Sequence, residues 1–376
     1  MTNRRSPGKT GIRQRSLCKG GEFRFFPHAK SRLTWPWKLP ALAFLFLLQL
    51  LSACGERPPE IERRAQFLMG TLVEISVRGP DRAKARDAIT LAFHEIARIE
   101  KMMSHRLPDS ELSRLKREAG KDYMPVSEEL LEVVREGIRW GELSGGALDI
   151  AIGPVADLWD FDEEKKQVPD AERLKQAVEL SRYQDIQIRG REMRLARTGM
   201  ALNLSSLAKG FAVDRAIAVL KQQGIQNAIV NAGGDLRAAG TRGKGLLWKI
   251  GLQHPRKPQE ILESFEIGDR AVATSGDYQR YFIRDGVRYH HIYNPESGMP
   301  ARGVSSVTVL GDSAMRADAL ATAIFVLGPE KGLALAATAG NAECLIVTDK
   351  GAVRRSNGFP VQPELSAKGL ADDFRD

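Results

Sequence analysis

The stretch that most constrains this chain lies near its middle, at residues 203–214, and reads Asn-Leu-Ser-Ser-Leu-Ala-Lys-Gly-Phe-Ala-Val-Asp. From Ala212 onward, apolar residues recur at helical spacing, which predicts an amphipathic helix that ends near Gly224. A strand-like entry, a Ser-Ser turn and the free N–H groups of a helix start can bind an anion such as a phosphate. Asp214 and Lys221, seven residues apart, mark the solvent side of the predicted helix. The alternative to an anion site is a plain strand-to-helix turn with Ser205 as the N-cap.

Basic residues are concentrated at the start of the chain. The protein has 376 residues and a formal net charge of +9. Residues 1–40 contain ten Lys or Arg and one Glu, and the remaining chain holds 46 basic and 46 acidic residues. Because the excess belongs to the leader, it does not indicate a surface that binds nucleic acid. We therefore expect no nucleic-acid partner.

The basic leader continues into an apolar run at residues 39–51 and then into Leu51-Ser52-Ala53-Cys54. This run is shorter than the roughly 20 residues that a membrane-spanning helix needs. A basic front, a short apolar middle and small residues at the end are typical of an export signal. The ending resembles a bacterial lipobox, in which Cys54 would be lipidated and would become the first residue of the mature protein.

Local patterns predict the main elements of the mature chain. A strand is expected at residues 71–78, helices at 85–103, 127–143 and from Asp170, a strand at 228–230, a hairpin around Asp285-Gly286, a strand at 304–310, and a helix capped by Asp312 that ends at Gly328. These strands and helices alternate without the regular spacing of βαβ units. The fold class we predict is therefore α+β with mixed, largely antiparallel sheets.

The chain lacks familiar nucleotide-binding motifs, but one helix carries ligands that suit a hard cation. Asp318 and Thr322 are four residues apart and share a helix face within an otherwise small and apolar run. A carboxylate and a hydroxyl suit Mg²⁺, with water and phosphate oxygens as further ligands. Alternatively, Thr322 bonds the Asp318 carbonyl while Asp318 pairs with an arginine. A histidine metal site is not expected, because His290 and His291 are adjacent on a strand and point to opposite faces.

Eight short motifs follow one another in a recognisable order across residues 67–345. They are Met69-Gly70-Thr71; Met103-Ser104 with Ser110-Glu111-Leu112-Ser113; Gly146-Ala147-Leu148-Asp149-Ile150 through Gly153-Pro154 to Leu158-Trp159; Ala208-Lys209-Gly210-Phe211-Ala212-Val213-Asp214; Asn231-Ala232-Gly233-Gly234-Asp235; Ala273-Thr274-Ser275-Gly276-Asp277-Tyr278; His291-Ile292; and Ala317-Asp318-Ala319-Leu320-Ala321-Thr322. Together, and behind a lipobox, they resemble the bacterial FAD:protein FMN transferases, the ApbE flavin-transferase lipoproteins.

The resemblance implies a two-lobed fold around a flavin-binding cleft, with FAD as substrate. It implies a divalent metal, usually Mg²⁺, held by the Ala208 carbonyl, Asp318 and Thr322. The FAD contacts it implies fall on Met69, Ser104, His105, Arg106, Ala147, Leu148, Asp149, Ser205 and Ile292. The implied reaction splits the FAD pyrophosphate, attaches FMN to a Thr or Ser hydroxyl of an exported protein, and releases AMP.

Two further residues receive candidate catalytic roles. Lys209, beside the implied carbonyl ligand, would add positive charge, although its plain interpretation is a solvated lysine at a helix start. His291 is the candidate base for the acceptor hydroxyl, although a lone histidine on a strand is more often structural. The chain departs from the family in having Asn203 and Asn294 where Asp is common, and Ser205-Ser206 where Gly-Gly is frequent.

The leading hypothesis is a Mg²⁺-dependent FMN transferase in the cell envelope, anchored by lipid to a membrane and facing the periplasm, or the outside in a Gram-positive host. Exported flavoproteins, among them subunits of membrane electron-transport complexes, are the expected acceptors. The alternatives are an FAD pyrophosphatase that gives FMN and AMP, and a non-catalytic FAD-binding lipoprotein. The expected segments are a signal peptide at 1–53, a lipid-anchored tether at 54–65, the catalytic domain at 66–365 and a C-terminal tail at 366–376.

Overall fold

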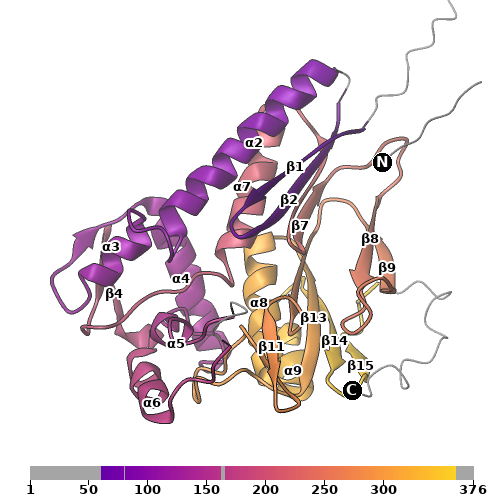
Figure 1. Ribbon diagram of the computed structural model, residues 1–376. Coiled ribbons are helices and arrows are strands. Elements are labelled where there is room, and N and C mark those ends of the chain that lie inside the picture. The colour runs from indigo at the N-terminus through magenta and orange to yellow at the C-terminus, as the bar shows by residue number, and fades with distance from the viewer. Residues whose placement is uncertain (1–60, 80, 162–165, 361–376) are drawn as a thin grey trace, which may run out of the picture. The chain divides into compact units, whose positions relative to one another are not determined.

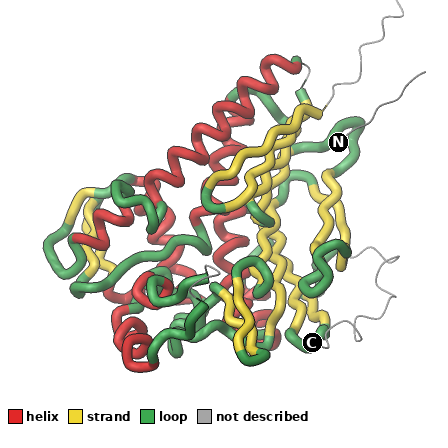
Figure 2. Tube along the Cα trace, in the orientation of Figure 1, coloured by secondary structure: helices red, strands yellow, loops and turns green. Residues whose placement is uncertain are grey.

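The computed structural model describes residues 61–79, 81–161 and 166–360, all of which belong to one compact unit. Its centre is an eight-stranded sheet in which every neighbouring pair of strands is antiparallel (Figures 1 and 2). In spatial order the strands are β1 (Ile61–Leu68), β2 (Thr71–Arg78), β6 (Asn227–Ala232), β7 (Asp235–Ala239), β10 (Ala271–Gly276), β13 (Val304–Gly311), β14 (Glu343–Thr348) and β15 (Val353–Arg355).

Helices cover one face of this sheet and a hairpin covers the other. The helices that share the main apolar core with the sheet include α2 (Arg82–Met103), α7 (Ala208–Gln222), α8 (Ala314–Leu327) and α9 (Pro329–Thr338). On the opposite face, β8 (Trp248–Gln253) and β9 (Ile261–Ile267) form a hairpin with its own apolar cluster. Alternate residues of each sheet strand therefore face different cores, as the pleat requires.

A further region lies between α2 and α7 in the sequence. It contains α3 (Glu111–Arg117), β3 (Met124–Pro125), α4 (Glu128–Leu143), α5 (Gly153–Ala156), α6 (Ala171–Leu180), the 3₁₀ turn η1 (Tyr183–Asp185), β4 (Ile186–Arg189) and β5 (Glu192–Leu195). The three strands form a small antiparallel sheet. The hairpin of β11 (Tyr281–Arg284) and β12 (Val287–His290) packs on this region, because Trp159 stacks with Tyr289 at 5.8 Å between ring centroids.

The structure confirms the predicted α+β class, and most of the predicted elements lie within one or two residues of their predicted positions. Ser127 accepts a hydrogen bond from the Leu130 N–H and begins α4, and Asp170 accepts N–H bonds at the start of α6. Asp285 and Gly286 both have positive φ, as a two-residue hairpin turn requires.

Three predictions at element ends were wrong. Residues 61–65, expected in the tether, form the first part of β1, which pairs with β2 along its whole length. The N-cap of α8 is Ser313 and not Asp312, since the Ser313 hydroxyl accepts from the Arg316 N–H. The N-cap of α7 is Leu207 and not Ser205, and no side chain caps that helix.

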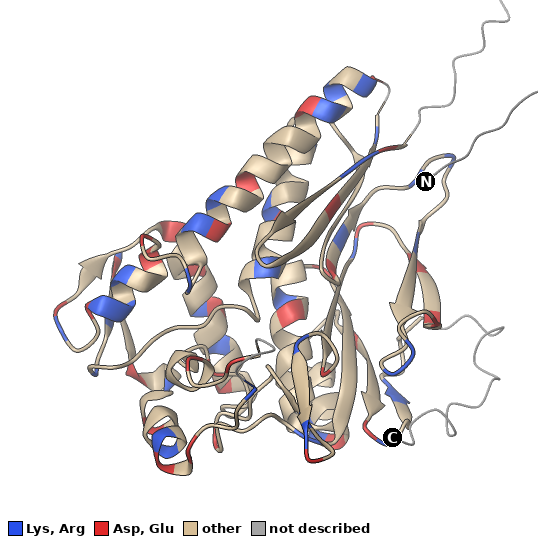
Figure 3. Cartoon of the chain, viewed as in Figure 1, with Lys and Arg blue, Asp and Glu red and all other residues tan. Residues whose placement is uncertain are grey.

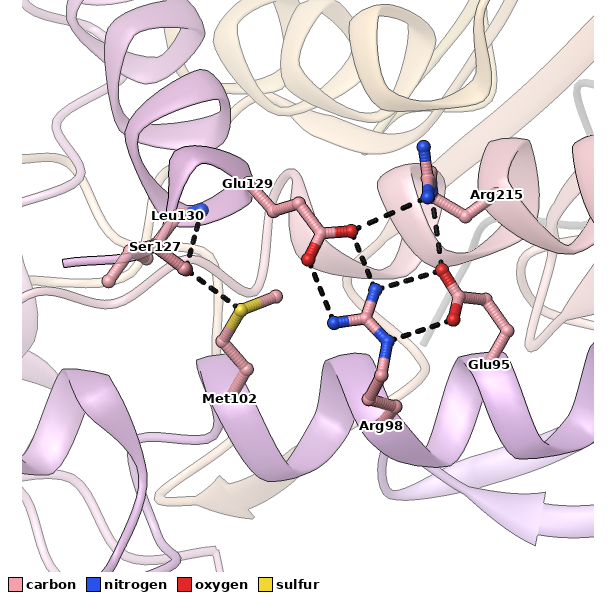
Figure 4. A network of polar contacts seen from close by, with 7 residues as sticks. All are labelled: Glu95, Arg98, Met102, Ser127, Glu129, Leu130 and Arg215. Atoms are coloured by element: carbon pink, nitrogen blue, oxygen red, sulfur yellow. Dashed lines mark hydrogen bonds and ion pairs between the residues drawn. The ribbon is translucent and has the colours of Figure 1, made fainter. Parts of the chain in front are cut away.

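Four charged side chains connect α2, α4 and α7 (Figure 4). Arg98 on α2 contacts Glu95 on the same helix at 2.8 Å and Glu129 on α4 at 2.6 Å. Arg215 on α7 lies 3.3 Å from Glu95 and 3.6 Å from Glu129. Residues of both charge signs occur along α2 (Figure 3), and this cluster belongs to that helix surface of mixed charge.

No helix among the described residues is long and apolar enough to cross a membrane. The signal peptide at 1–53, the start of the tether with Cys54, and the tail at 366–376 lie outside the described residues. The prediction of a lipid anchor therefore stays a prediction.

Candidate functional site

A lysine and two carboxylates form a mostly buried cluster between α7, α8 and the end of the sheet. Lys209 Nζ lies 2.9 Å from Asp235 Oδ2 and 3.3 Å from Asp318 Oδ2. The side chains of Asp235 and Asp318 are only 3% and 5% exposed, whereas that of Lys209 is 26% exposed. Lys209 is therefore not the solvated lysine of the plain interpretation. One ammonium here faces two carboxylates, so the cluster carries an excess of one negative charge when all three are ionised.

A close approach of α7 to α8 builds this cluster. A Cβ atom added at Gly210 would lie 2.3 Å from the Ala314 carbonyl oxygen, so only glycine allows the two helix starts to come this near. The Gly210 backbone also donates a hydrogen bond to the Asp318 carboxylate. The glycine beside Lys209 therefore sets both the distance between the helices and the orientation of Asp318.

Asp214 fixes the second point of contact between the same helices. Its carboxylate accepts the backbone N–H groups of Ala314 and Met315, at 3.0 and 3.1 Å, and the Ser313 hydroxyl. Arg237 pairs with it at 2.6 Å. The prediction that Asp214 lies on the solvent side was wrong, because this carboxylate binds the free N–H groups at the start of α8.

The surroundings shift the ionisation of the cluster. Burial raises the pKa of the Asp318 carboxyl, and the neighbouring Asp235 raises it further, although Lys209 opposes both effects. Burial would lower the pKa of Lys209, but Asp235 and Asp318 together more than offset this and leave that pKa raised. Lys209 is thus cationic at neutral pH, whereas the raised pKa of Asp318 means that this carboxyl is held less firmly in its ionised form.

The donors around this cluster fit a hard divalent cation. Thr322 lies one turn after Asp318 on α8, and its hydroxyl is 3.2 Å from the Ser275 hydroxyl. Among the described residues, Asp318 pairs with Lys209 and not with an arginine, and the Thr322 hydroxyl contacts Ser275 and not the Asp318 carbonyl. Asp235 Oδ2 is buried without a hydrogen-bond partner despite its proximity to Lys209. No group of three or more His, Cys, Asp or Glu able to hold a metal occurs in the described ranges, so a metal here would need hydroxyl or carbonyl ligands as well.

The two adjacent histidines have different environments, and the prediction that both lie on one strand was wrong, because β12 ends at His290. His290 is buried, its Nε2 lies 2.9 Å from the Ala301 carbonyl oxygen, and its ring packs edge-on against Phe325. The Nδ1 of His291 lies 3.3 Å from the Arg280 carbonyl oxygen, which can only accept, so the proton belongs on Nδ1 and the lone pair on Nε2. Burial lowers the pKa of His291 to about 3, which keeps this ring neutral at physiological pH.

The Met69 turn lies at the same end of the sheet as Asp235. Met69 and Gly70 both have positive φ in the two-residue turn between β1 and β2, and the Met69 N–H donates to Glu100 at 2.8 Å. Gly233, two residues before Asp235, packs directly on Thr71, since an added Cβ would lie 2.3 Å from the Thr71 hydroxyl. Two motifs that are far apart in the sequence therefore meet here.

The other predicted FAD residues occupy loops and turns. Ser104 caps the end of α2, and its hydroxyl accepts from the N–H groups of Arg106 and Leu107. Both Asp149 carboxylate oxygens accept backbone N–H groups, from Ala151 at 2.7 Å and from Tyr183 at 3.0 Å. Burial nevertheless raises the pKa of Asp149 to about 6.

The two asparagine departures retain a local hydrogen bond. Asn203 Oδ1 accepts from the Ser205 N–H at 3.0 Å, and Asn294 Oδ1 accepts from the Glu296 N–H at 2.8 Å. An aspartate would accept the same bonds, so the change removes a charge and keeps the turn. The Ser205 carbonyl oxygen in turn accepts from Lys209 Nζ at 2.8 Å.

Comparison with known proteins assigns the family. The model of the ApbE family matches residues 69–346, which is more than half of the chain and includes the buried cluster. The chain belongs to the ApbE family. The resemblance identified from the eight motifs is therefore confirmed.

Relatives in the ApbE family match over most of their length. A protein of Vibrio cholerae named FAD:protein FMN transferase is 38% identical over 300 residues, 78% of this chain and 90% of the relative. One of Treponema pallidum with the same name is 32% identical over 345 residues, 86% of this chain and 94% of the relative. Two solved structures, the ApbE protein of Thermotoga maritima and the flavin transferase ApbE of V. cholerae, give TM-scores of 0.74 and 0.72 at 32% and 35% identity, over 80% of this chain and 98% and 97% of theirs.

Three residues of this ApbE chain were not predicted from the sequence: Asp235 in the cluster, and Gly210 and Asp214, which hold α7 against α8. Asp235 was noted only as part of a motif, although a carboxylate directly after a Gly-Gly turn was the available signal. Gly210 and Asp214 stood inside the central stretch, but their partners at 313–315 lie about a hundred residues away. Only the packing of α7 on α8 could reveal those contacts.

Proposed function

We propose that this chain cleaves the pyrophosphate of FAD and attaches FMN to a Thr or Ser hydroxyl of an exported flavoprotein, with release of AMP. The observation that carries the proposal is the Lys209–Asp235–Asp318 cluster, in which two buried carboxylates share one ammonium at the start of a helix. Membership of the ApbE family and the names of the relatives support the same reaction.

We propose Mg²⁺ as the cofactor, held by the Ala208 carbonyl, the Asp318 carboxylate and the Thr322 hydroxyl. These are hard oxygen donors, and the excess of negative charge in the cluster favours a divalent cation. When bound, Mg²⁺ neutralises phosphate charge and acts as a Lewis acid and template. Met69, Ser104, His105, Arg106, Ala147, Leu148, Asp149, Ser205 and Ile292 stay our candidates for FAD contacts.

The chain's own residues supply positioning and proton transfer. Lys209, anchored by Asp235, Asp318 and the Ser205 carbonyl, presents a fixed positive charge to the phosphates. His291 is neutral, with its lone pair on Nε2, so it can accept the proton of the acceptor hydroxyl. The pKa of about 3 makes it a weak base, so proton transfer is expected late, as the phosphorus–oxygen bond forms.

One incubation distinguishes this proposal from its alternatives. The mature chain is mixed with FAD, Mg²⁺ and candidate exported flavoproteins, among them subunits of membrane electron-transport complexes, and flavin fluorescence is measured on the denatured proteins. Covalent fluorescence with release of AMP supports the transferase. Free FMN without labelling supports the pyrophosphatase, and unchanged FAD supports a non-catalytic carrier. Either of the last two results overturns the proposal.

We further propose that the protein is lipidated on Cys54 and held at a membrane of the cell envelope, facing the periplasm or, in a Gram-positive host, the outside. The support is the basic and apolar leader that ends in Leu51-Ser52-Ala53-Cys54. Cys54→Ser should abolish labelling by a radioactive fatty acid and leave the leader uncleaved by the lipoprotein peptidase. Equal labelling of the variant and the parent would exclude Cys54 as the lipidation site.

A further inference from the structure

A cleft of about 790 Å³ lies on the face of the sheet that is opposite the buried cluster. Leu236 of β7 and Val272 of β10 line it, and both belong to the apolar cluster under the β8–β9 hairpin. Their neighbours in the strands, Asp235 and Ala273, face the helices instead. The cleft is thus separated from the cluster by the thickness of the sheet.

The cleft and the cluster meet at the Gly233–Gly234 turn, which joins β6 to β7. Both glycines line the cleft, and the next residue is Asp235. At Gly234 an added Cβ would find only the Gln279 side-chain amide, at 4.0 Å, so the chain is open there. Thr274 also lines the cleft, and the residue after it, Ser275, contacts Thr322. Only the Gly233–Gly234 turn therefore separates this end of the cleft from the Lys209–Asp235–Asp318 cluster.

Among the residues that the structure describes, basic side chains line the cleft and acidic ones do not. Arg256 is neutralised by a bidentate pair with Asp277, at 2.7 and 2.8 Å. Lys257 lies 3.8 Å from Glu260 at the surface. Arg288 stacks over the Tyr281 ring at 3.9 Å, and its Nη1 is buried without a hydrogen-bond partner among the described residues. A buried guanidinium donor without an acceptor favours a bound carboxylate.

We propose that this cleft binds the acceptor polypeptide as an extended segment, with an acidic side chain on Arg288 and Lys257 and the hydroxyl residue at Gly234. The apolar floor of Leu236, Ile250 and Val272 suits a chain with alternating side chains. None of our candidate FAD residues lines the cleft, so the two substrates occupy opposite faces and meet at the turn. The inference rests on the proposed transferase function.

The test uses the full mature chain and two short fluorescent peptides with one central threonine, one flanked by aspartates and the other by lysines. Binding is followed by fluorescence anisotropy without FAD. The parent should bind the aspartate peptide at least about tenfold more tightly than the lysine peptide. Arg288→Glu and Lys257→Glu, made separately in case one fails to fold, should each reduce or reverse this preference.

Lys249→Glu is the matched control. Lys249 lies on β8, in the β8–β9 hairpin that also carries Lys257, and it is exposed but does not line the cleft. It should bind both peptides like the parent, and all three variants should retain the parent's affinity for FAD. The proposal is overturned if neither peptide binds the parent, if the preference survives both cleft variants, or if those variants weaken FAD binding instead. Because binding is measured without turnover, a failure of the transferase proposal would appear separately, as absent labelling of exported flavoproteins.

Discussion

Two clusters of charged side chains connect helices in this protein, and they differ in their ratio of positive to negative groups and in how deeply they are buried. The Glu95–Arg98–Glu129–Arg215 cluster has two cations and two carboxylates, and its arginines are each 46% exposed (Figure 4). In the Lys209–Asp235–Asp318 cluster, one cation serves two carboxylates that are at most 5% exposed. The first cluster has equal numbers of positive and negative groups, whereas the second has one ammonium for two carboxyl groups.

We propose that this difference separates a structural contact from a functional one. Exposed ion pairs contribute about 0–1 kcal/mol each, and a balanced set needs no ligand. A buried charge without a matched partner is costly, so an unbalanced buried set persists where the protein uses it. The contrast predicts that changes in the two clusters will affect different properties.

The largest effect is expected for Asp318→Ala in the unbalanced cluster. This change removes the one charged ligand that we assign to Mg²⁺, so FAD turnover should fall at least about a hundredfold. The free energy of unfolding should change little, since one carboxylate remains for Lys209. Turnover across a Mg²⁺ titration and chemical denaturation measure the two quantities. If turnover at limiting Mg²⁺ equals that of the parent, Asp318 is structural.

Gly210→Ala tests whether the contact between α7 and α8 sets the cluster. The added Cβ would lie 2.3 Å from the Ala314 carbonyl, so the helices must separate, at a cost of about 1–3 kcal/mol in the free energy of unfolding. Activity should fall as well, because Asp318 moves away from Lys209. Gly224→Ala is a control at the far end of α7, where φ is positive and the added Cβ would meet only the end of the Lys84 side chain, at 3.1 Å. A Gly210 variant with parental stability and turnover would contradict this account.

Thr322→Val and Ala208→Gly should have smaller effects on turnover. Valine removes a neutral donor that water can replace, so we expect a loss of the order of tenfold, which corresponds to about 1.4 kcal/mol. Ala208→Gly keeps the backbone carbonyl and should lose least. Steady-state turnover at several Mg²⁺ concentrations gives the ranking. A larger loss for Ala208→Gly than for Asp318→Ala would refute the assigned ligands.

The smallest effect is expected in the balanced cluster. Hydrogen bonding to Arg98 lowers the pKa of Glu95 in the folded state, so its contribution to stability is present above the unfolded pKa and is lost as pH falls through the folded pKa. Glu95→Gln should therefore cost no more than about 1 kcal/mol at pH 7, without loss of turnover. In acid the variant and the parent should unfold alike. Chemical denaturation at several pH values tests whether the stability difference between parent and variant disappears as pH falls.

The parts of the fold that the sequence predicted are those with local causes. Ser127 caps its own helix, and Asp285-Gly286 makes its own turn, so neighbours in the chain were sufficient. Strand β1 was missed because its charged residues are those of an edge strand, which has an exposed face and only one neighbour. The predicted tether consequently ended too late.

The site was predictable where one helix carries its residues. Asp318 and Thr322 share a face by spacing alone. The role of Asp235 and the burial of Lys209 depend on the end of β7 meeting α7 and α8, and the spacing along the chain carries no such information. Asp214 looked solvent-exposed because its partners belong to another helix.

The most direct measurement is the thermal unfolding of the FAD-loaded chain with and without Mg²⁺, for the parent, Asp318→Ala and Arg98→Met. A cation that binds the folded protein stabilises it, by about 2.7 kcal/mol at a hundred times its dissociation constant. We predict that Mg²⁺ raises Tm for the parent and for Arg98→Met but not for Asp318→Ala. An equal rise in all three, or none in the parent, would contradict a divalent cation at the Lys209–Asp235–Asp318 cluster.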